Sequence, residues 1–482
     1  MIDDKNIRKK LLVGSVSLIS IIVLIFGAIG PSLFVTQVST DDAPINVTVI
    51  NWDIIVPDDY ADIQEAVRHA SSGDWIFVKS GTYYARRFYT SQALLIDVPD
   101  LTIRGEHRNS TIITGRDRSD GVVIKADGVN FSGFSLKDNE INGSLLKLYG
   151  SHCQIWDNNF DVNNFYNGNE YGVRFYNADE NVFSYNHVIN GDRAIDLVGS
   201  DYNRFIGNIV EKNYQAVDVD EMYMIDFTQR MTKKIFKQPC EGNRFEDNIF
   251  RENTHGVILD GSIDDVFINN TFELNSRNGL VLSNCLNNKI LRNKFIENGF
   301  EIWGTELEHY VHEIGGNTVN GKPLYYYRGN YNIEVPKNAG QIILVDCENT
   351  YIKYVKISNT STAVLTAFCE DTTIYDSDFR NNYRGVYFYY STKNKVKYNN
   401  FINNRIHASF VIKGFLNSKK NIWGRNYWKN ILELPIPLGK GIPQKITGVY
   451  HLQRPFKSEE KIKIGFLTKN YDWLPVRRPY TL

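Results

Sequence analysis

The chain has 482 residues and a formal net charge of −1, so it is long enough for a large core and lacks the positive excess typical of nucleic-acid binding. Five cysteines in so long a chain exclude a small disulfide-stabilised scaffold. Tyrosine (29) and phenylalanine (27) are abundant, and asparagine-rich turns argue against a mostly helical protein. We therefore expect an all-β fold with long columns of apolar side chains and no nucleic-acid partner.

The N-terminus combines a short basic tail, residues 1–10, with an uncharged apolar run over residues 11–35. A run of about 25 apolar residues is long enough to span a bilayer, whereas the core of a signal peptide is usually shorter. We predict a transmembrane signal anchor over 11–35 with residues 1–10 in the cytoplasm, because the positive flank comes first. A cleaved signal peptide is the alternative. In both cases the bulk of the chain is expected to be extracellular or periplasmic, after a linker over 36–55.

A short amphipathic helix is predicted at residues 62–70. This stretch places Ile63, Ala66 and Val67 on one helical face, and an apolar strand begins soon afterwards at Trp75. Such a helix suits the open end of a repeat stack, whose apolar interior would otherwise meet water. We expect it to be an N-terminal cap.

The main body is repetitive. Three copies of one motif (NRFEDNIFREN, DVFINNTFELN and NKILRNKFIEN) start at Asn243, Asp265 and Asn288, which are 22 and 23 residues apart. Short alternating apolar runs between Asn, Gly and Asp turns make each copy a coil of β-strands in a solenoid. Asparagine suits the turns because it tolerates left-handed backbone and its amide can bond the coils above and below. This predicts a right-handed parallel β-helix over residues 56–430.

Two segments depart from the repeat. An insert of about 18 residues, near 221–240, delays the next coil, and such insertions usually form loops on the binding face. We expect a lid, with a short amphipathic helix as one form that it could take. Residues 431–482 lose the period and are expected to wrap the final coil as a C-terminal cap or small module.

Several stretches carry a family resemblance. The segment VPDDYADIQEAVRHASSGDWIFVKSGTYYAR, from Val56, closely resembles the start of pectin-lyase-like β-helix proteins. The coils, together with NGKPLYYY, GQIILVDC and NIWGRNYW, resemble the NosD group of periplasmic copper-associated proteins and its carbohydrate-binding and sugar-hydrolase relatives. The resemblance covers roughly residues 56–480. It implies the β-helix fold strongly and leaves the activity open, because one fold hosts many functions.

The period also predicts an acidic patch on the outer face. Inward-pointing Ile195 and Leu197 leave Asp196 outside, and stacked coils put residues one period apart about 4.8 Å from each other. The predicted patch comprises Arg174, Asp196, Asp218, Asp220 and Asp260, with Arg193 and His255 beside it. Stacked carboxylates raise one another's pKa or bind a hard cation such as Ca²⁺.

Two interpretations of this patch stay open. The residues are candidate catalytic groups of a polysaccharide lyase or hydrolase, or Arg174 and Asp196 form an outward salt-bridge ladder among solvated acids. The polygalacturonase arrangement of Gly-His-Gly, Arg-Ile-Lys and Asn-Thr-Asp is absent from the sequence, which weakens hydrolysis as the reading.

The insert holds Met222, Met224 and Met231, whose thioethers suit Cu(I). The alternative is that these methionines form the apolar face of a packed lid. Cys347 and Cys369 lie one coil apart and are expected to be free thiols, because neighbouring parallel strands give poor disulfide geometry.

Four tyrosines are candidate sugar-binding platforms: Tyr325, Tyr327, Tyr387 and Tyr389. Alternation along the strand GVYFYY points Tyr387 and Tyr389 outward, where a large stiff ring with a polar tip can stack on a sugar. Packing beneath loops or the C-terminal module is the alternative.

Three function classes follow from these features. The leading hypothesis is a membrane-anchored protein that binds polysaccharide or glycan at the cell surface, since binding needs no complete catalytic set. The second is a carbohydrate-active enzyme, a lyase or hydrolase, that uses the acidic patch. The third is a NosD-like accessory factor that handles copper.

Overall fold

The computed structural model describes residues 52–84, 92–114, 120–137, 143–162, 171–220, 222–226, 234–413, 421–429, 444–453, 463–472, 476 and 478–481. The predicted cytoplasmic tail, the predicted anchor at 11–35 and nearly all of the linker lie outside these ranges. Within them, no helix is long and apolar enough to cross a membrane.

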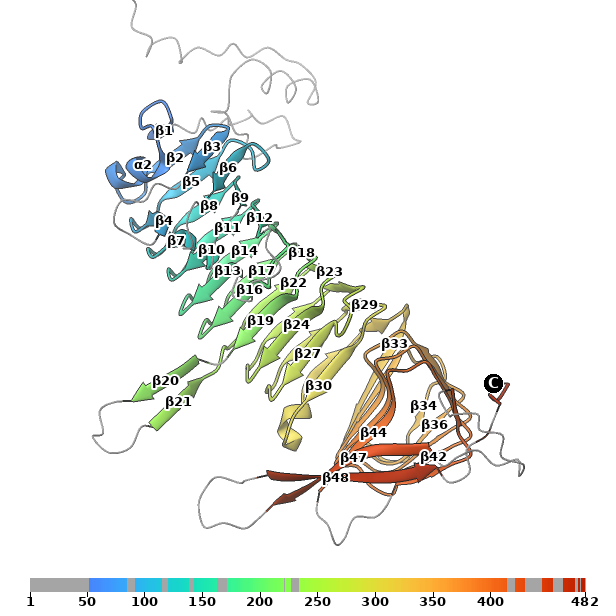
Figure 1. Ribbon diagram of the computed structural model, residues 1–482. Helices are drawn as coiled ribbons and strands as arrows, with labels where there is room; N and C mark the ends of the chain where they lie inside the picture. Colours follow the sequence, from blue (N-terminus) through green and yellow to red (C-terminus); the bar gives the residue numbers. More distant parts are fainter. Residues whose placement is uncertain are drawn as a thin grey trace, which may run out of the picture.

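The first part of the chain is a parallel β-solenoid of the right-handed type, as predicted (Figure 1). Each coil gives one strand to each of three sheets. The nine-stranded sheet contains β4 (Gln92–Ile96), β7 (Asp120–Ile124), β10 (Ser144–Leu148), β13 (Tyr171–Tyr176), β16 (Arg193–Val198), β19 (Gln215–Asp220), β24 (His255–Asp260), β27 (Leu280–Ser283) and β30 (Phe300–Trp303). The eleven-stranded sheet contains β1 (Ile54–Val56), β2 (Trp75–Val78), β5 (Thr102–Gly105), β8 (Asn130–Ser132), β11 (Gln154–Trp156), β14 (Val182–Ser184), β17 (Arg204–Ile206), β22 (Arg244–Glu246), β25 (Val266–Ile268), β28 (Lys289–Leu291) and β31 (Glu313–Gly315). The third sheet contains β3 (Gly81–Tyr84), β6 (Thr111–Thr114), β9 (Ser135–Lys137), β12 (Asn159–Asp161), β15 (His187–Ile189), β18 (Ile209–Glu211), β23 (Ile249–Arg251), β26 (Thr271–Glu273), β29 (Lys294–Ile296) and β32 (Thr318–Val319).

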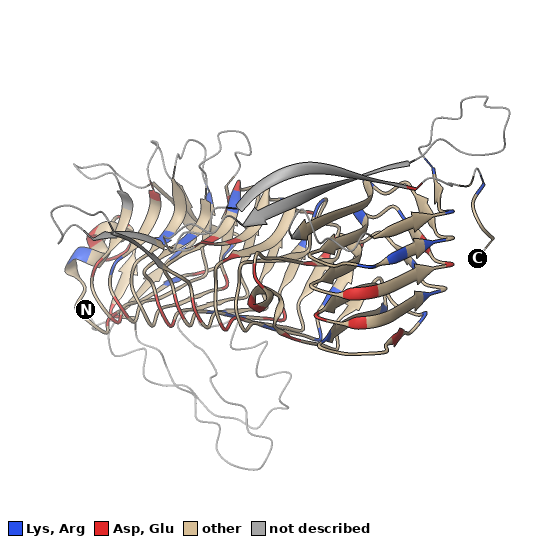
Figure 2. Ribbon diagram, turned by 90° about the horizontal axis from the view of Figure 1, so that it is seen from below, with Lys and Arg blue, Asp and Glu red and all other residues tan. Residues whose placement is uncertain are grey.

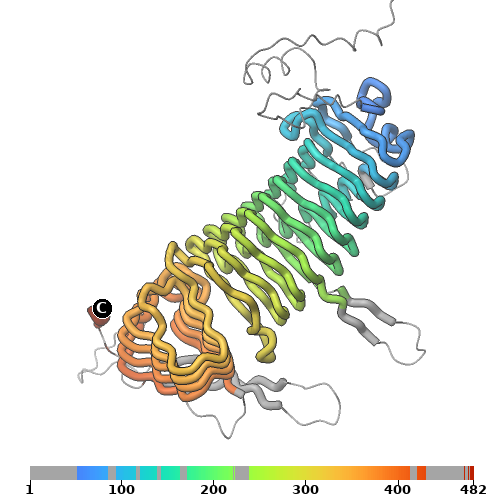
Figure 3. The backbone as a smooth tube through the Cα atoms, turned by 180° about the vertical axis from the view of Figure 1, so that it is seen from behind, coloured from blue at the N-terminus to red at the C-terminus, as the bar shows by residue number. Residues whose placement is uncertain are grey.

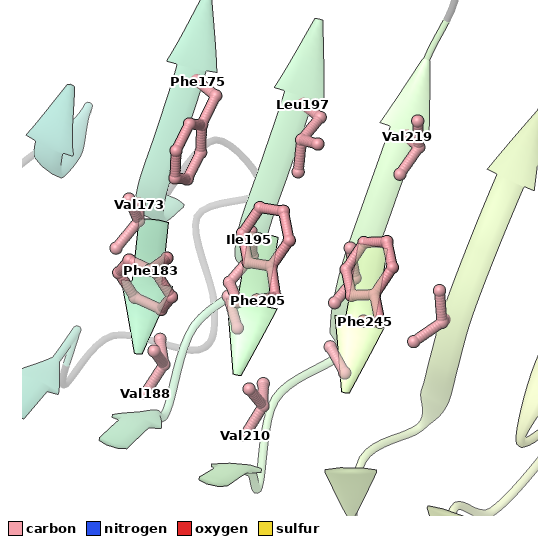
Figure 4. Packing of buried hydrophobic residues seen from close by; sticks show 14 of the residues in the cluster. Val173, Phe175, Phe183, Val188, Ile195, Leu197, Phe205, Val210, Val219 and Phe245 are labelled. Atoms are coloured by element: carbon pink, nitrogen blue, oxygen red, sulfur yellow. The ribbon is translucent and has the colours of Figure 1, made fainter. Parts of the chain in front are cut away.

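The solenoid interior is a set of aromatic and aliphatic columns (Figure 4). The rings of Phe205 and Phe245 stack with centroids 4.7 Å apart, and those of Phe245 and Phe267 at 4.5 Å. All three side chains are buried. Burial of each ring contributes about 1.5–3 kcal/mol, which explains why the motif keeps an aromatic or aliphatic residue at this position.

Buried asparagines hold the turns together. Asn208 Nδ2 donates to Asn248 Oδ1 at 2.9 Å, and Asn248 Nδ2 donates to Asn270 Oδ1 at 3.0 Å. The predicted coil-to-coil amide bonding is therefore confirmed. The left-handed backbone belongs instead to the residue before each ladder asparagine, such as Asp247 with φ 54° and Asn269 with φ 57°. An asparagine is required at the ladder position because its side-chain amide bonds both neighbouring coils: Asn248 accepts from Asn208 and donates to Asn270.

The chain reverses direction after β32. Asn320 and Gly321 have φ values of 50° and 74°, as in a tight hairpin turn, and β33 (Lys322–Arg328) pairs antiparallel with β32. The coils after this turn form a C-terminal stack that is turned relative to the first (Figure 3). The predicted single run over 56–430 thus consists of two stacks.

The C-terminal stack repeats the three-sheet plan. Its C-terminal sheet contains β33, β35 (Gln341–Val345), β38 (Thr362–Ala367), β41 (Arg384–Tyr389), β44 (Ile406–Lys413), β47 (Gln444–Gln453) and β48 (Lys463–Asp472). Its other sheets contain β34 (Glu334–Val335), β36 (Glu348–Lys353), β39 (Glu370–Tyr375), β42 (Lys395–Lys397), β45 (Ile422–Gly424), β37 (Lys356–Ser358), β40 (Asp378–Arg380), β43 (Asn400–Ile402) and β46 (Tyr427–Trp428). Asp472 closes one asparagine ladder by accepting from Asn426 N at 2.9 Å and from Trp428 Nε1 at 3.1 Å.

The two additional elements differ in how well they match expectation. Helix α2 (Ile63–His69) forms where a helix was predicted and buries Ile63, Ala66 and Val67; its role as a cap stays a prediction. The insert contains an antiparallel hairpin, β20 (Met222–Asp226) and β21 (Lys234–Gln238), so a helix in these residues was the wrong form. Within the described residues of the insert, β20 and β21 pair along their whole length, and the hairpin projects from the stack (Figure 1).

Candidate functional site

Acidic and basic positions are interspersed along the described strands (Figure 2). One column on the outer face of the nine-stranded sheet changes from basic to acidic. In register, Lys147 pairs with Arg174, Arg174 with Asp196, and Asp196 with Asp218. The period predicted the pairings of Arg174 with Asp196 and of Asp196 with Asp218, because coils of 22 residues place each outer residue beside its counterpart.

Three carboxylates from this region form the acidic triad: Asp196, Asp218 and Asp220. One oxygen from each lies within 4.8 Å of the others. Asp196 is 0% exposed and Asp218 is 6% exposed, while Asp220 is half-buried. The outward direction predicted for Asp196 is right, but the residue is covered. Its two carboxylate oxygens have no well-aligned hydrogen bond among the described residues.

Two arginines cover the acidic triad. Arg174 Nε lies 2.7 Å from Asp196 Oδ2. Arg193 Nε lies 3.1 Å from Asp218 Oδ2, and its Nη1 lies 3.6 Å from Asp196 Oδ1. The ring of Tyr171 packs beneath both guanidinium groups, at 4.6 Å and 5.7 Å from its centroid. The arginines are therefore held in place by carboxylates on one side and by an aromatic face on the other.

Burial raises the pKa values of two acids of the triad, Asp196 and Asp218, toward neutral pH. It raises the pKa of Asp196 to about 6, against the opposing charges of Arg174 and Arg193. Burial and then the charge of Asp220 raise the pKa of Asp218 to about 7, with Arg193 opposing. Because the carboxylates share one space, their proton belongs to the cluster. The site can therefore hold and release a proton near pH 7.

Two predicted members are not in the triad. Asp260 is exposed, and Asn284 Nδ2 donates to its Oδ1 at 3.5 Å. The neighbour of Asp218 on β24 is Ile258, which ends the acidic column. His255 lies beside Gln215, with its Nε2 3.1 Å from Arg277 Nη1; burial and then the charge of Arg277 lower its pKa. Neither residue reaches the carboxylates.

The four tyrosines have different surroundings from those expected of an exposed platform. Tyr389 points out of the core of its own stack, as predicted, but it is only 5% exposed, so the sugar-facing surface expected of it is wrong and the packed alternative holds. Its ring stacks on Tyr390 at 4.3 Å and on Tyr310 at 5.5 Å, because the C-terminal sheet packs against the end of the first stack. Tyr387 is half-buried. Tyr325 and Tyr327 are also half-buried, with ring centroids 6.1 Å apart.

The acidic triad does not fit Cu(I). The triad offers only carboxylate oxygens, whereas Cu(I) prefers sulfur. The five cysteines are buried free thiols, as expected for Cys347 and Cys369. Met222 lies half-buried against Gly199. The side chains of Met224 and Met231 lie outside the described residues, so a thioether site stays a prediction.

Ca²⁺ prefers oxygen ligands, so the three carboxylates of the triad suit calcium better than copper. Two guanidinium groups nevertheless lie among the three carboxylates, at 2.7 Å and 3.1 Å, and leave about one net negative charge for a cation. The predicted calcium site therefore has the right atoms in an unfavourable charge environment.

One family model matches the second half of this chain. The family model "Periplasmic copper-binding protein (NosD)" matches residues 225–331 and 330–433, which confirms the resemblance to that family over these residues. No curated protein matches the sequence.

Similar solved structures include the A-module of Azotobacter vinelandii mannuronan C-5 epimerase AlgE4, at 13% identity over 75% of this chain and 88% of that chain, with a TM-score of 0.35. An alginate lyase from Paenibacillus sp. str. FPU-7 has 13% identity over 75% and 95%, with a TM-score of 0.30. The catalytic domain of GH87 alpha-1,3-glucanase in complex with nigerose has 14% identity over 81% and 70%, with a TM-score of 0.38. Likenesses at this level say nothing about the reaction or substrate of this chain.

Proposed function

We propose that this chain is an exported carbohydrate-active enzyme that hydrolyses a polysaccharide at the acidic triad. The observation behind this proposal is the triad itself: three carboxylates within 4.8 Å on the outer face of a long sheet, with the pKa of Asp218 raised to about 7. Catalytic acids work best when their pKa lies near the working pH, and burial beside like charges is how proteins achieve it.

The residues divide into roles. Asp218 holds the proton and donates it to the glycosidic oxygen as the C–O bond breaks. Asp220, the more accessible carboxylate, attacks the anomeric carbon as that bond breaks, because carboxylates within 4.8 Å leave no room for a water between them. Water then hydrolyses the glycosyl ester and restores Asp220, while Asp218 takes the proton of the water. Arg193 contacts Asp196, Asp218 and Asp220 and keeps the triad compact while the proton moves. Tyr171 and Arg174 position this cluster.

This hypothesis replaces glycan binding without turnover as the leading one. The hypothesis of glycan binding without turnover depended on outward-facing tyrosines as sugar platforms. One of these tyrosines, Tyr389, is buried. A buried carboxylate cluster costs folding free energy, since each charge must be desolvated. Such a cost on an outer face is more typical of a catalytic site than of a surface that only needs complementarity.

The test is an assay of new reducing ends, with the full-length chain in detergent and a panel of neutral and acidic polysaccharides. We expect at least one substrate to be cleaved, and we expect Asp218→Asn and Asp220→Asn to reduce the rate by about 100-fold or more. Asp260→Asn is the matched control, because Asp260 lies on the same sheet outside the triad. Cleavage that survives Asp218→Asn, or binding without any cleavage, contradicts the proposal.

We also propose that residues 11–35 anchor the enzyme outside the cytoplasm. The uncharged run supports this location, as does the periplasmic description of the matching family. The full-length chain should need detergent for extraction. A soluble mature form with its N-terminus near residues 36–43 would instead indicate a cleaved signal peptide.

A further inference from the structure

The outer face of the nine-stranded sheet ends at a wall. Beyond β30 no strand of the described residues extends this sheet; the C-terminal sheet meets it instead (Figures 1 and 3). Gln341 of β35 takes the place of the next strand: its Oε1 accepts from Phe300 N at 3.1 Å and its Nε2 donates to Phe300 O at 2.6 Å. The edge of β30 is thereby sealed against the second stack.

Glu301 shows that the C-terminal sheet stands over this face. Its outer column runs from Asp218 through Ile258 and Val281 to Glu301. An outward glutamate at a strand edge should be solvated, yet Glu301 is 2% exposed. Thr362 Oγ1, from the C-terminal sheet, donates to its Oε1 at 2.8 Å, so residues of the second stack cover it.

Polar and aromatic side chains from both stacks meet at this corner. Trp303 Nε1 donates to Glu301 Oε2 at 2.7 Å, which fixes the indole while leaving Trp303 40% exposed. Arg384 is in register with Thr362, and its guanidinium lies 4.3 Å from the centroid of the Tyr387 ring. Arg384 Nε is buried without a hydrogen-bond partner in the described part of the chain.

We infer that Trp303, Glu301, Arg384 and Tyr387 form a subsite for the terminal sugar residue of the glycan chain. An immobilised indole face stacks on a sugar ring. The guanidinium of Arg384 donates to a sugar hydroxyl, while the buried carboxylate of Glu301 holds the indole of Trp303 in place. Because the C-terminal sheet closes this end of the outer face, the end of a glycan chain can reach the subsite, whereas an internal segment cannot continue past it.

The position of the subsite gives the cleavage pattern, and this part rests on the proposed hydrolase. Three strand steps separate Asp218 from Glu301, or about 14 Å at 4.8 Å per strand. That distance holds a few sugar residues. The enzyme therefore acts from chain ends and releases short fragments of narrow length.

The experiment uses the full-length chain with a polysaccharide that the wild type binds or cleaves and with short oligosaccharides of it. Calorimetry gives affinity and chromatography gives product length. Trp303→Ala should weaken oligosaccharide affinity about tenfold and broaden the product lengths. Trp303→Phe should recover much of both. Trp75→Ala is the control, since Trp75 is 37% exposed on another sheet.

The two proposals fail separately. Asp218→Asn should bind the oligosaccharide with wild-type affinity and cleave nothing. Binding that depends on Trp303 without cleavage by the wild type overturns the hydrolase and keeps the subsite. Unchanged affinity in Trp303→Ala, or internal cutting seen as an early fall in viscosity, overturns the subsite. If Trp303→Ala lowers the melting temperature, Arg384→Gln provides the same comparison.

Discussion

Arg193 Nε lies 3.1 Å from Asp218 Oδ2, although the two residues come from neighbouring coils. The same guanidinium lies 3.6 Å from Asp196 and 3.8 Å from Asp220. Its positive charge opposes the rise in the pKa of Asp218 that burial and Asp220 cause. Arg193 therefore limits how far burial and Asp220 raise the pKa of Asp218.

Replacing Arg193 with glutamine should move the pH profile. Without the guanidinium, the pKa of Asp218 rises further above about 7, so the general acid stays protonated to higher pH. The alkaline limb of kcat/KM should move up in pH, while Arg277→Gln should leave it in place. If the alkaline limb of kcat/KM stays at the same pH or moves to lower pH in Arg193→Gln, Asp218 is not the proton donor.

Calcium should not stabilise the wild-type protein, because Arg174 and Arg193 already oppose a cation at the triad. We expect no change in melting temperature up to millimolar calcium. Arg193→Gln should create a response, equivalent to about 2.7 kcal/mol at a hundredfold excess over the dissociation constant. Adding Asp218→Asn should abolish that response. A calcium-dependent rise in the wild type would restore the calcium site predicted from the sequence.

A second prediction about pH concerns Asp265, which replaces asparagine in a buried ladder. Its Oδ1 accepts from Asn243 N at 2.8 Å, as an asparagine would. Its Oδ2 and Asn288 Nδ2 have no partner within the described ranges. Burial raises the pKa of Asp265 to about 7. A raised pKa means that folding stability is full below about pH 4 and falls as pH rises through 7.

Asp265→Asn should therefore raise the free energy of unfolding at pH 8, by at most about 4 kcal/mol for a shift of three pKa units. The gain should shrink toward pH 4, and chemical denaturation at both values measures it. Asn270→Asp, in a neighbouring ladder, is the reverse control and should destabilise more at pH 8 than at pH 4. An equal effect of Asp265→Asn at both values would contradict the buried proton.

The assignment of inward and outward positions is open to a direct test. Leu259 is fully buried in the core, whereas Ile268 is an outer residue of the following strand β25. Leu259→Asp should cost several kcal/mol, comparable to the stability of many domains, because it buries an unpaired carboxylate. Ile268→Asp should leave the melting temperature nearly unchanged. Similar melting temperatures for the two variants would contradict the assignment of Leu259 to the inner face and Ile268 to the outer face.

The sequence alone determined the repeating part of this protein. In a solenoid, spatial neighbours lie at a constant sequence offset, so the period was enough to place Arg174 beside Asp196 and Asp196 beside Asp218. It also identified the inward phenylalanines and the asparagine ladders. Each of these relationships depends on one coil and its immediate neighbour.

Only the tertiary structure decided what breaks the period. The turn at Asn320–Gly321 brings Thr362 onto Glu301, 61 residues away, and Tyr389 onto Thr305, 84 residues away. A 22-residue period does not predict contacts between residues so far apart in the sequence. The period therefore predicted an exposed Tyr389 and gave no indication that Glu301 is covered. The covering of Asp196 was equally hidden, since periodicity gives the direction of a side chain and not what packs over it. The burial that raises the pKa values of the triad thus comes from packing between side chains, which alternation along a strand cannot report.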